Sequence, residues 1–302
     1  MRVRTGLAVL PLVLVPLVAC APQDDDSGSS ATDETSSAPT ATESAGTTTS
    51  ASPVDACATD QLNLKTAGQL TVGTDSPAYD PWFKGNDPSN GKGYESAVAY
   101  EVAKRLGFGA DQVTWVKVPF NTSYKPGDKD FDFDINQITI TPERAEVVDF
   151  SDSYYDGSQG IIAMKDSDVA KATSVDDLAS FKLGAQTGTT SLSAARDIVS
   201  DPMVFEDTNA AKQALVNGQV DAIVADLPTA VFISEAEIKN STVVGQFIDP
   251  KIGPDQFGML FAKGNPLVSC VNSALAAMTS DGTIDALQAQ WLADYQAVPV
   301  LQ

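Results

Sequence analysis

FDFDINQITITPER, residues 131–144, is the stretch of sequence that does most to predict the fold. Apolar side chains alternate with aspartates from Phe131 to Ile135, a pattern typical of a strand with one buried face. The alternation shifts at the Asn-Gln pair that follows and resumes at Ile138. We interpret the shift as the end of a strand, where polar side chains become available to a site.

Strands and helices alternate on both sides of this stretch. Upstream, the patterns predict strands at 68–75 and 113–118 and a helix at 93–107 with apolar residues every four positions. Downstream, they predict strands at 160–164, 182–185 and 220–226, and helices near 191, at 208–216, at 266–278 and at 283–295. This alternation predicts an α/β fold with mostly parallel strand pairing.

Ligands of such folds bind beyond the carboxyl ends of the strands. Asp75, Thr139, the segment from Thr187 to Thr190 and Asp226 all follow predicted strands in this way. We therefore expect these residues to meet at one site.

The N-terminal residues predict export and lipidation. Arg2 and Arg4 precede an apolar run at 7–18, which has the length of a signal-peptide core and ends in LVAC at Cys20. This ending resembles the lipobox of bacterial lipoproteins, so we expect residues 1–19 to be a signal peptide and Cys20 to carry lipid. The protein would then be anchored to the cell membrane on its outer, extracytoplasmic face. A plain secretory signal is the alternative.

Residues 20–55 are predicted to form a disordered tether. They consist mainly of Ser, Thr, Ala, Asp and Pro, without an aromatic residue. Such a segment buries too little apolar surface to offset the entropy of ordering it.

Two further cysteines, Cys57 and Cys270, remain in an oxidising compartment. We predict a disulfide that ties the start of the folded region to a C-terminal helix. One buried and one exposed free thiol is the alternative.

Composition excludes several classes of function. The chain has 40 acidic and 19 basic residues, a net charge of −21, which argues against binding nucleic acid. It has no His, which removes Ser–His and Cys–His catalysis and His-ligated metal sites. Aspartates at 128–134 suggest calcium, but Ile135 stands where an EF-hand loop requires Gly. We expect no metal and no cofactor.

Arg144 and Asp226 are the two charges that point to a ligand. A free amino acid carries a carboxylate, which a guanidinium and hydroxyl groups recognise, and an ammonium, which needs a carboxylate. A closed site must satisfy both charges.

Each of these residues also has a purely structural interpretation. Arg144 could pair on the surface with Glu143 or Asp149, and Asp226 could cap the helix that follows it. The TGTT segment, 187–190, could be a turn before a helix. Tyr79 and Trp82 could pack in the core.

ITITPERAEVVDFSDSYY, residues 138–155, resembles the signature of the family 3 extracellular solute-binding proteins, which bind polar amino acids. Four further segments resemble the family in the same order along the chain. They are GYESAVAYEVAKRLG from Gly93, LGAQTGTTS from Leu183, VDAIVADLPTA from Val220 and DGTIDALQAQW from Asp281.

The resemblance implies a role for each candidate ligand-binding residue. Arg144 would clamp the ligand carboxylate, helped by the hydroxyl of Thr139, the backbone of Gln137 and Thr190 from the opposite lobe. Asp226 would hold the ammonium and Asp75 would face the ligand side chain or its amino group. Tyr79 and Phe120 would stack on the aliphatic part of the ligand.

The fold that the resemblance implies is a two-lobe α/β fold of the periplasmic-binding-protein type II class with two hinge crossovers. Lobe 1 would comprise residues 56–158 and 255–302, and lobe 2 residues 159–254. The protein would be a monomer that closes on an amino acid and delivers it to the permease subunits of an ABC importer. The alternative is an enzyme on the same fold, similar to cyclohexadienyl dehydratase, with Asp75 or Asp226 as its acid or base.

Overall fold

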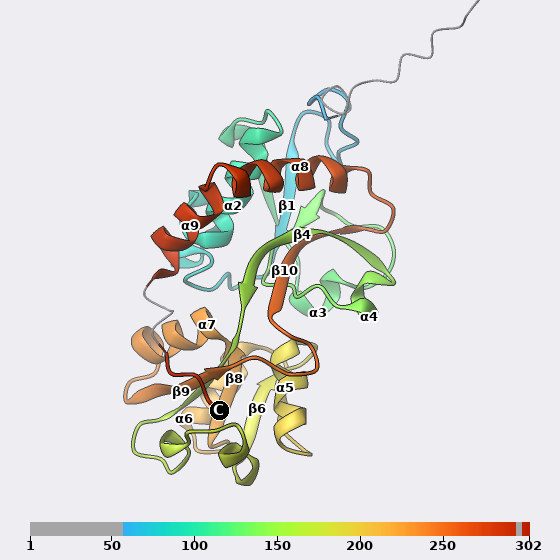
Figure 1. Ribbon diagram of the computed structural model, residues 1–302. Helices are drawn as coiled ribbons and strands as arrows, with labels where there is room; N and C mark the ends of the chain where they lie inside the picture. The colour runs from blue at the N-terminus through green and yellow to red at the C-terminus, as the bar shows by residue number, and fades with distance from the viewer. Residues whose placement is uncertain (1–56, 294–297) are drawn as a thin grey trace, which may run out of the picture. The chain divides into compact units, whose positions relative to one another are not determined.

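The computed structural model describes residues 57–293 and 298–302. The predicted signal peptide, the lipidation site Cys20 and the predicted tether lie outside these residues. The described part is built on two five-stranded sheets, each with helices packed against it (Figure 1).

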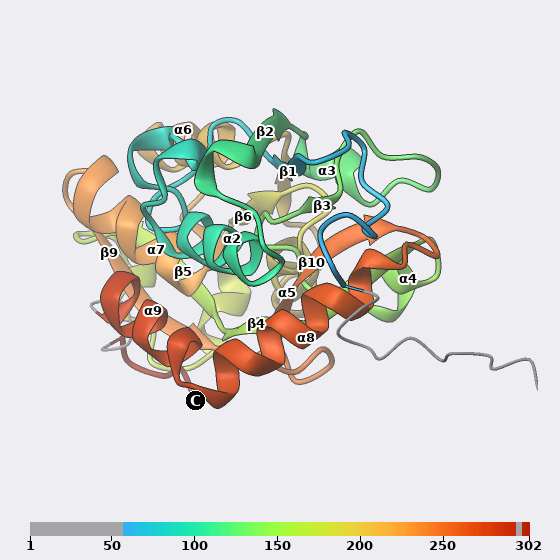
Figure 2. The same ribbon diagram turned by 90° about the horizontal axis from the view of Figure 1, so that it is seen from above.

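The first sheet has the strand order β2-β1-β3-β10-β4. Its strands are β1 (Leu70–Thr74), β2 (Val113–Lys117), β3 (Phe133–Asp134), β4 (Val148–Gly157) and β10 (Asp255–Ala262). Three helices lie beside one another over this sheet (Figure 2): α2 (Tyr94–Arg105), α8 (Leu267–Ser280) and α9 (Thr283–Trp291). The short helices α3 (Phe120–Ser123) and α4 (Pro142–Ala145) follow β2 and β3.

Helix α2 shows why this part of the sequence folds as predicted. Val98 and Val102 lie on its buried face, as their spacing of four residues requires. Gly93 precedes the helix at φ 94°, and a Cβ at this position would lie 2.4 Å from the carbonyl oxygen of Trp82. Only glycine allows the helix to begin this close to the preceding segment.

The second sheet has the strand order β7-β6-β8-β5-β9. Its strands are β5 (Gln159–Met164), β6 (Leu183–Gln186), β7 (Met203–Phe205), β8 (Ala222–Asp226) and β9 (Ser241–Phe247). Its helices are α5 (Thr190–Ile198), α6 (Thr208–Val216) and α7 (Leu227–Phe232). Apolar residues of β5 and β8 are buried on both faces of the sheet, which explains their continuous apolar sequence.

Short helical turns complete the described part. They are 3₁₀ segments at Lys84–Asn86, Pro88–Asn90, Ala110–Gln112, Val169–Lys171 and Asp176–Ser180, and a π-helical turn at Ile233–Glu237.

The chain passes directly from one sheet to the other at two places. Strand β4 ends at Gly157 and β5 begins at Gln159, while β9 ends at Phe247 and β10 begins at Asp255. The two sheets and these crossovers form the expected two-lobe α/β fold.

The expectation of mostly parallel pairing is wrong. Parallel pairing joins β1 to β2 and β3, and β6 to β7 and β8. Strands β5 and β10, by contrast, pair antiparallel with both of their neighbours. Both strands enter their sheet straight from a crossover, without the helical connection that parallel neighbours need.

The C-terminal residues also depart from the expected lobe boundary, which placed all of 255–302 with lobe 1. Val300 pairs with Gln246 of β9, and Leu301 packs in the apolar cluster of the second sheet. The reason is packing, because Leu301 lies directly over Gly245, where a larger residue would leave it no room.

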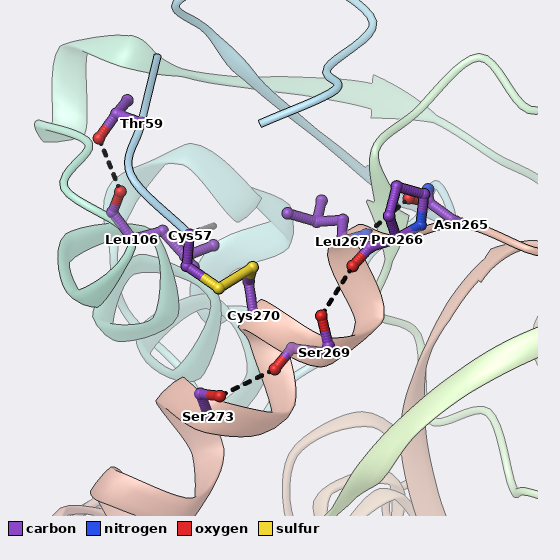
Figure 3. The surroundings of a disulfide bond; sticks show 9 residues. All are labelled: Cys57, Thr59, Leu106, Asn265, Pro266, Leu267, Ser269, Cys270 and Ser273. Carbon is purple, nitrogen blue, oxygen red and sulfur yellow. Dashed lines mark hydrogen bonds between the residues drawn. A yellow bond between two sulfur atoms is a disulfide. The ribbon is translucent and has the colours of Figure 1, made fainter. Parts of the chain in front are cut away.

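The predicted disulfide between Cys57 and Cys270 is confirmed (Figure 3). Cys270 lies on α8, and Thr59 near the other cysteine donates a hydrogen bond of 2.9 Å to the carbonyl oxygen of Leu106. The bond joins residues 213 positions apart, so it ties the start of the described chain to the helical layer of the first sheet.

Among the described residues, no helix combines the length and the apolar character that a membrane crossing requires.

Candidate ligand-binding site

A cavity of about 60 Å³ lies at the carboxyl ends of strands from both sheets. Seven of the eight predicted ligand-binding residues line it: Asp75, Tyr79, Phe120, Gln137, Thr139, Thr190 and Asp226. The eighth, Arg144, does not line this cavity but a neighbouring one of about 510 Å³, and Thr189 and Thr190 line both.

Asp75 follows β1 and is held by backbone amides of the first lobe. Its Oδ1 accepts a hydrogen bond from the backbone N–H of Ser76 at 2.6 Å, and its Oδ2 accepts one from Phe120 at 3.1 Å. These bonds orient the carboxylate, and each oxygen keeps a lone pair for a ligand.

Thr139 and Thr190 meet across the cavity from the two lobes. Their hydroxyl oxygens lie 3.3 Å apart, and both side chains are buried. Thr190 is the first residue of α5, whose N-cap Thr189 accepts a hydrogen bond from the Leu192 backbone at 3.0 Å. The first N–H groups of a helix have no partner within the helix, so this end of the cavity suits an anion.

The guanidinium of Arg144 lies directly behind these threonines. It donates hydrogen bonds to the carbonyl oxygens of Thr139 at 2.6 Å and Gly188 at 2.8 Å. It also stacks on the rings of Phe120 and Tyr124, with centroids 5.6 Å and 4.9 Å from its central carbon. Burial lowers the pKa of this guanidinium from its ordinary value.

The alternative of a surface ion pair for Arg144 is wrong. Its side chain is only 9% exposed, and Asp149 pairs instead with Lys263 at 2.9 Å.

Asp226 ends β8 and also lines the cavity. It stands at the N-cap position of α7, but its side chain makes no capping hydrogen bond, so the helix-cap alternative is wrong. Burial, reinforced by the charge of Asp255, raises the pKa of Asp226 well above its ordinary value. A carboxylate in these surroundings is stabilised by a bound cation.

Gln137 lines the cavity in a way that the sequence did not predict. Its backbone N–H, expected to face the ligand carboxylate, donates instead to Oε1 of Glu95 at 2.7 Å, and its side-chain amide donates to Oε2 of the same residue. Gln137 is held at φ 47°, which turns the chain between β3 and Thr139.

Glu95 is fully buried and also accepts a hydrogen bond from the hydroxyl of Tyr154. Burial raises the pKa of Glu95 to about 7, although these hydrogen bonds act in the opposite direction. Glu95 therefore positions one wall of the cavity without lining it.

The aromatic residues divide between the core and the cavity. Trp82 is fully buried in the core of the first lobe, and its Nε1 donates to Thr229 of the second lobe at 2.8 Å. Tyr79 lines the cavity, and its hydroxyl is buried with no hydrogen-bond partner among the described residues. The core-packing alternative therefore holds for Trp82 but not for Tyr79.

A family model described as bacterial extracellular solute-binding proteins, family 3, matches residues 70–294. This chain belongs to that family. The match takes in both sheets and the residues of the cavity.

Curated relatives of this solute-binding protein come from Escherichia coli and Bacillus subtilis. It is 30% identical over 234 residues to the L-cystine-binding protein TcyJ of Escherichia coli K12, covering 76% of this chain and 84% of that one. It is 31% identical over 216 residues to the ABC transporter glutamine-binding protein GlnH of Bacillus subtilis, covering 68% and 75%.

Solved structures of similar proteins agree with the two-lobe fold. An ancestral arginine-binding protein bound to arginine is 31% identical with a TM-score of 0.63, and covers 74% of this chain and 98% of its own. The ancestral amino acid-binding protein AncCDT-1, a precursor of cyclohexadienyl dehydratase, is 33% identical with a TM-score of 0.61, and covers 74% of this chain and 95% of its own. These relatives are binding proteins, so they support a binding protein over the enzyme alternative.

Several residues of the cavity were not predicted from the sequence of this solute-binding protein. They are Asn136, Gln186, Ser191, Thr208, Val224, Ala225 and Thr229. Gln186 accepts a hydrogen bond from the Thr208 hydroxyl at 2.8 Å, which joins the end of β6 to the start of α6. The signal for this pair was present, because both residues stand at the ends of predicted elements.

Within the described ranges, no group of three or more acidic, Cys or His side chains is arranged to hold a metal ion.

Proposed function

We propose that this protein is the extracellular solute-binding component of an ABC importer and binds one free amino acid in the cavity between its lobes. The observation that carries the proposal is the set of groups that line one cavity. Asp226 contributes a half-buried carboxylate, and the Thr190 hydroxyl and the N-terminus of α5 contribute hydrogen-bond donors.

The amino acid would lie with its ammonium at Asp226 and its carboxylate at Thr190 and the N-terminus of α5. Arg144 would supply positive charge from directly behind them, since it holds the carbonyl groups of Thr139 and Gly188. A charge on each end of the ligand then meets an opposite charge or a set of donors, as a dry site requires.

The rest of the cavity supports a polar side chain on the ligand. Asp75 and the unpartnered hydroxyl of Tyr79 line it, and so do Gln186 and Thr208. Among the described residues, the lining contains no Lys or Arg, so a ligand that donates hydrogen bonds is favoured over an acidic one. Relatives named for glutamine, arginine, histidine and cystine fit this preference.

Closure of the lobes would follow from the position of the ligand. A ligand that touches Thr139 in lobe 1 and Thr190 and Asp226 in lobe 2 binds the closed form more tightly than the open one. Residues 56–158 with the body of 255–302 would move as one lobe and residues 159–254 as the other.

The cellular arrangement belongs to the same proposal. The LVAC ending at Cys20 supports a lipid anchor on the outer face of the membrane, with residues 20–55 as the tether. The protein would act as a monomer whose closed form is recognised by the permease subunits.

A thermal-shift screen of the purified protein against the twenty amino acids and L-cystine tests the proposal. A ligand that binds only the folded state at 100 times its dissociation constant adds about 2.7 kcal/mol to stability. We expect one or a few polar amino acids to raise the melting temperature. No effect from any of the twenty amino acids or from L-cystine, or turnover of prephenate or arogenate, would contradict the proposal.

A further inference from the structure

A continuous chain of four side chains runs from one wall of the cavity to the other behind its lining. The Thr139 hydroxyl donates to Oδ1 of Asp255 at 3.0 Å, and Nε2 of Gln159 donates to Oδ2 of the same carboxylate at 2.6 Å. The same Nε2 lies 3.4 Å from Oδ1 of Asp226. Thr139 and Asp226 line the cavity, whereas Gln159 and Asp255 do not.

Gln159 and Asp255 are the first residues after the two crossovers. Gln159 begins β5, where the chain enters the second sheet, and Asp255 begins β10, where it returns to the first. Their side chains are 1% and 4% exposed, so the hydrogen bond between them joins both crossover strands away from solvent.

The chain leaves the charges of this region unbalanced. Asp226 and Asp255 share a single amide group, which is well placed for Asp255 and distant from Asp226. The second polar atom of that amide, Oε1 of Gln159, is buried with no partner among the described residues. Two carboxylates with only this amide and the Thr139 hydroxyl as side-chain donors call for a cation on the cavity side, next to Asp226.

We propose that Asp255 and Gln159 are positioning residues for the ligand ammonium, which act through Asp226 and transmit its occupancy to both crossover strands. This inference rests on the proposed function, because it requires an ammonium at Asp226. Asp255 adds negative charge to the ammonium site, and Gln159 keeps Asp226 ionised and directed towards the cavity.

Asp255 and Gln159 have opposite effects on the pKa of Asp226. Burial and the charges of Asp255, from β10, and Glu95, from α2, raise the pKa of Asp226, while the hydrogen bond from Gln159 and the charge of Arg144, from α4, lower it. Burial and the charge of Asp226 in turn raise the pKa of Tyr155 in β4. Binding of an ammonium to a protonated Asp226 must release a proton, so affinity should increase as pH rises.

The test is a pH series of calorimetric titrations with the tightest of L-arginine, L-glutamine, L-histidine and L-cystine as probe. Release of one proton changes the dissociation constant about tenfold per pH unit. For wild type we expect tighter binding at pH 8 than at pH 5.5. We expect Asp255→Asn to bind about tenfold more weakly at pH 8, with a flatter pH profile.

Gln159→Leu should also weaken binding, but with a steeper pH profile. The substitution removes the side-chain amide that favours the ionised form of Asp226. The matched control is Asp156→Asn, an exposed aspartate of β4 that accepts hydrogen bonds from Ser153 and Gln256 and should leave the profile unchanged. Cooperative thermal unfolding of each variant establishes that it is folded. Either variant alone can test the inference, because the two are expected to change the slope of affinity against pH in opposite directions.

A wild-type pH slope in Asp255→Asn, or a flatter slope in Gln159→Leu, would overturn the inference and leave the proposed function standing. A wild-type protein that binds none of the amino acids would overturn the proposed function, and this inference with it.

Discussion

Glu95 shows how one buried side chain connects the cavity to the stability of the fold. It supports Gln137 through the backbone and the side chain, and no part of it reaches solvent. Asp134 lies next to it, with both carboxylate oxygens buried and unpartnered, and burial together with the charge of Glu95 raises the pKa of Asp134 well above its ordinary value. The first lobe thus contains two carboxyl groups that hold their protons more tightly than they would in the unfolded chain.

This arrangement predicts the pH dependence of stability. The pKa of Glu95 rises from 4.5 to about 7, so between these pH values the folded state binds more protons than the unfolded state. The free energy of unfolding should therefore increase as the pH falls from 7 to 4.5, by about 3 kcal/mol from Glu95 alone.

Glu95→Gln should flatten this slope without removing it, because Asp134 contributes with the same sign. Urea denaturation at several pH values measures the effect, with the exposed Glu206→Gln as control. An unchanged slope in Glu95→Gln would show that Glu95 is ionised in the folded protein at pH 5.

The role of Glu95 could not be read from the sequence, since its partners Gln137 and Tyr154 lie 42 and 59 positions away. Arg144 and Asp226 were identifiable because each follows a strand and bears the charge that an amino acid needs. The position of the Arg144 guanidinium behind Thr139 and Gly188 depends on packing against Phe120 and Tyr124, for which the sequence carries no local signal.

Helix α5 is the element that delivers donors to the cavity. Its N-cap Thr189 holds the Leu192 backbone N–H, which fixes the first turn where Thr190 and Ser191 line the cavity. Thr189→Val keeps the shape of the side chain but removes the acceptor, so we expect a loss of about 1 kcal/mol in the free energy of unfolding.

The same substitution should weaken amino acid binding, because the frayed turn no longer presents its N–H groups. Thr189→Ser retains the hydroxyl and should behave as wild type in chemical denaturation and calorimetry. If Thr189→Val and Thr189→Ser matched each other in both measurements, the cap would have no role in the site.

Elements with a strong local pattern were predictable, and strands without one were not. Helix α2 and strands β1 and β8 carry clear periodicities, and their boundaries agree within a few residues. Strands β4, β7, β9 and β10 were missed. In β4 buried and exposed positions follow no regular alternation, and the pairing of β4 and β10 has register shifts, so neither face of β4 is uniformly apolar.

At the scale of the whole molecule, the disulfide joins the start of the described chain to helix α8. Cross-linking residues 213 positions apart reduces the entropy of the unfolded chain, so the double variant Cys57→Ser, Cys270→Ser should lose about 2–5 kcal/mol in the free energy of unfolding. Neither cysteine lines the cavity, so amino acid affinity should stay at the wild-type value.

Denaturation and calorimetry on the double variant and on wild type check both halves of this prediction. Equal stability of the two proteins would mean that the disulfide adds nothing to the fold. A lower affinity in the folded double variant would mean that the helical layer of the first sheet influences the cavity.

The central claim is that one cavity recognises both charged ends of a free amino acid. Calorimetric titration of the wild-type protein with its tightest amino acid, with the α-carboxamide of that amino acid and with its N-acetyl derivative tests this claim most directly. Each derivative removes one charge and leaves a buried partner unpaired, so we predict that each binds about 100-fold more weakly than the parent. Binding of either derivative as tightly as the free amino acid would contradict the account.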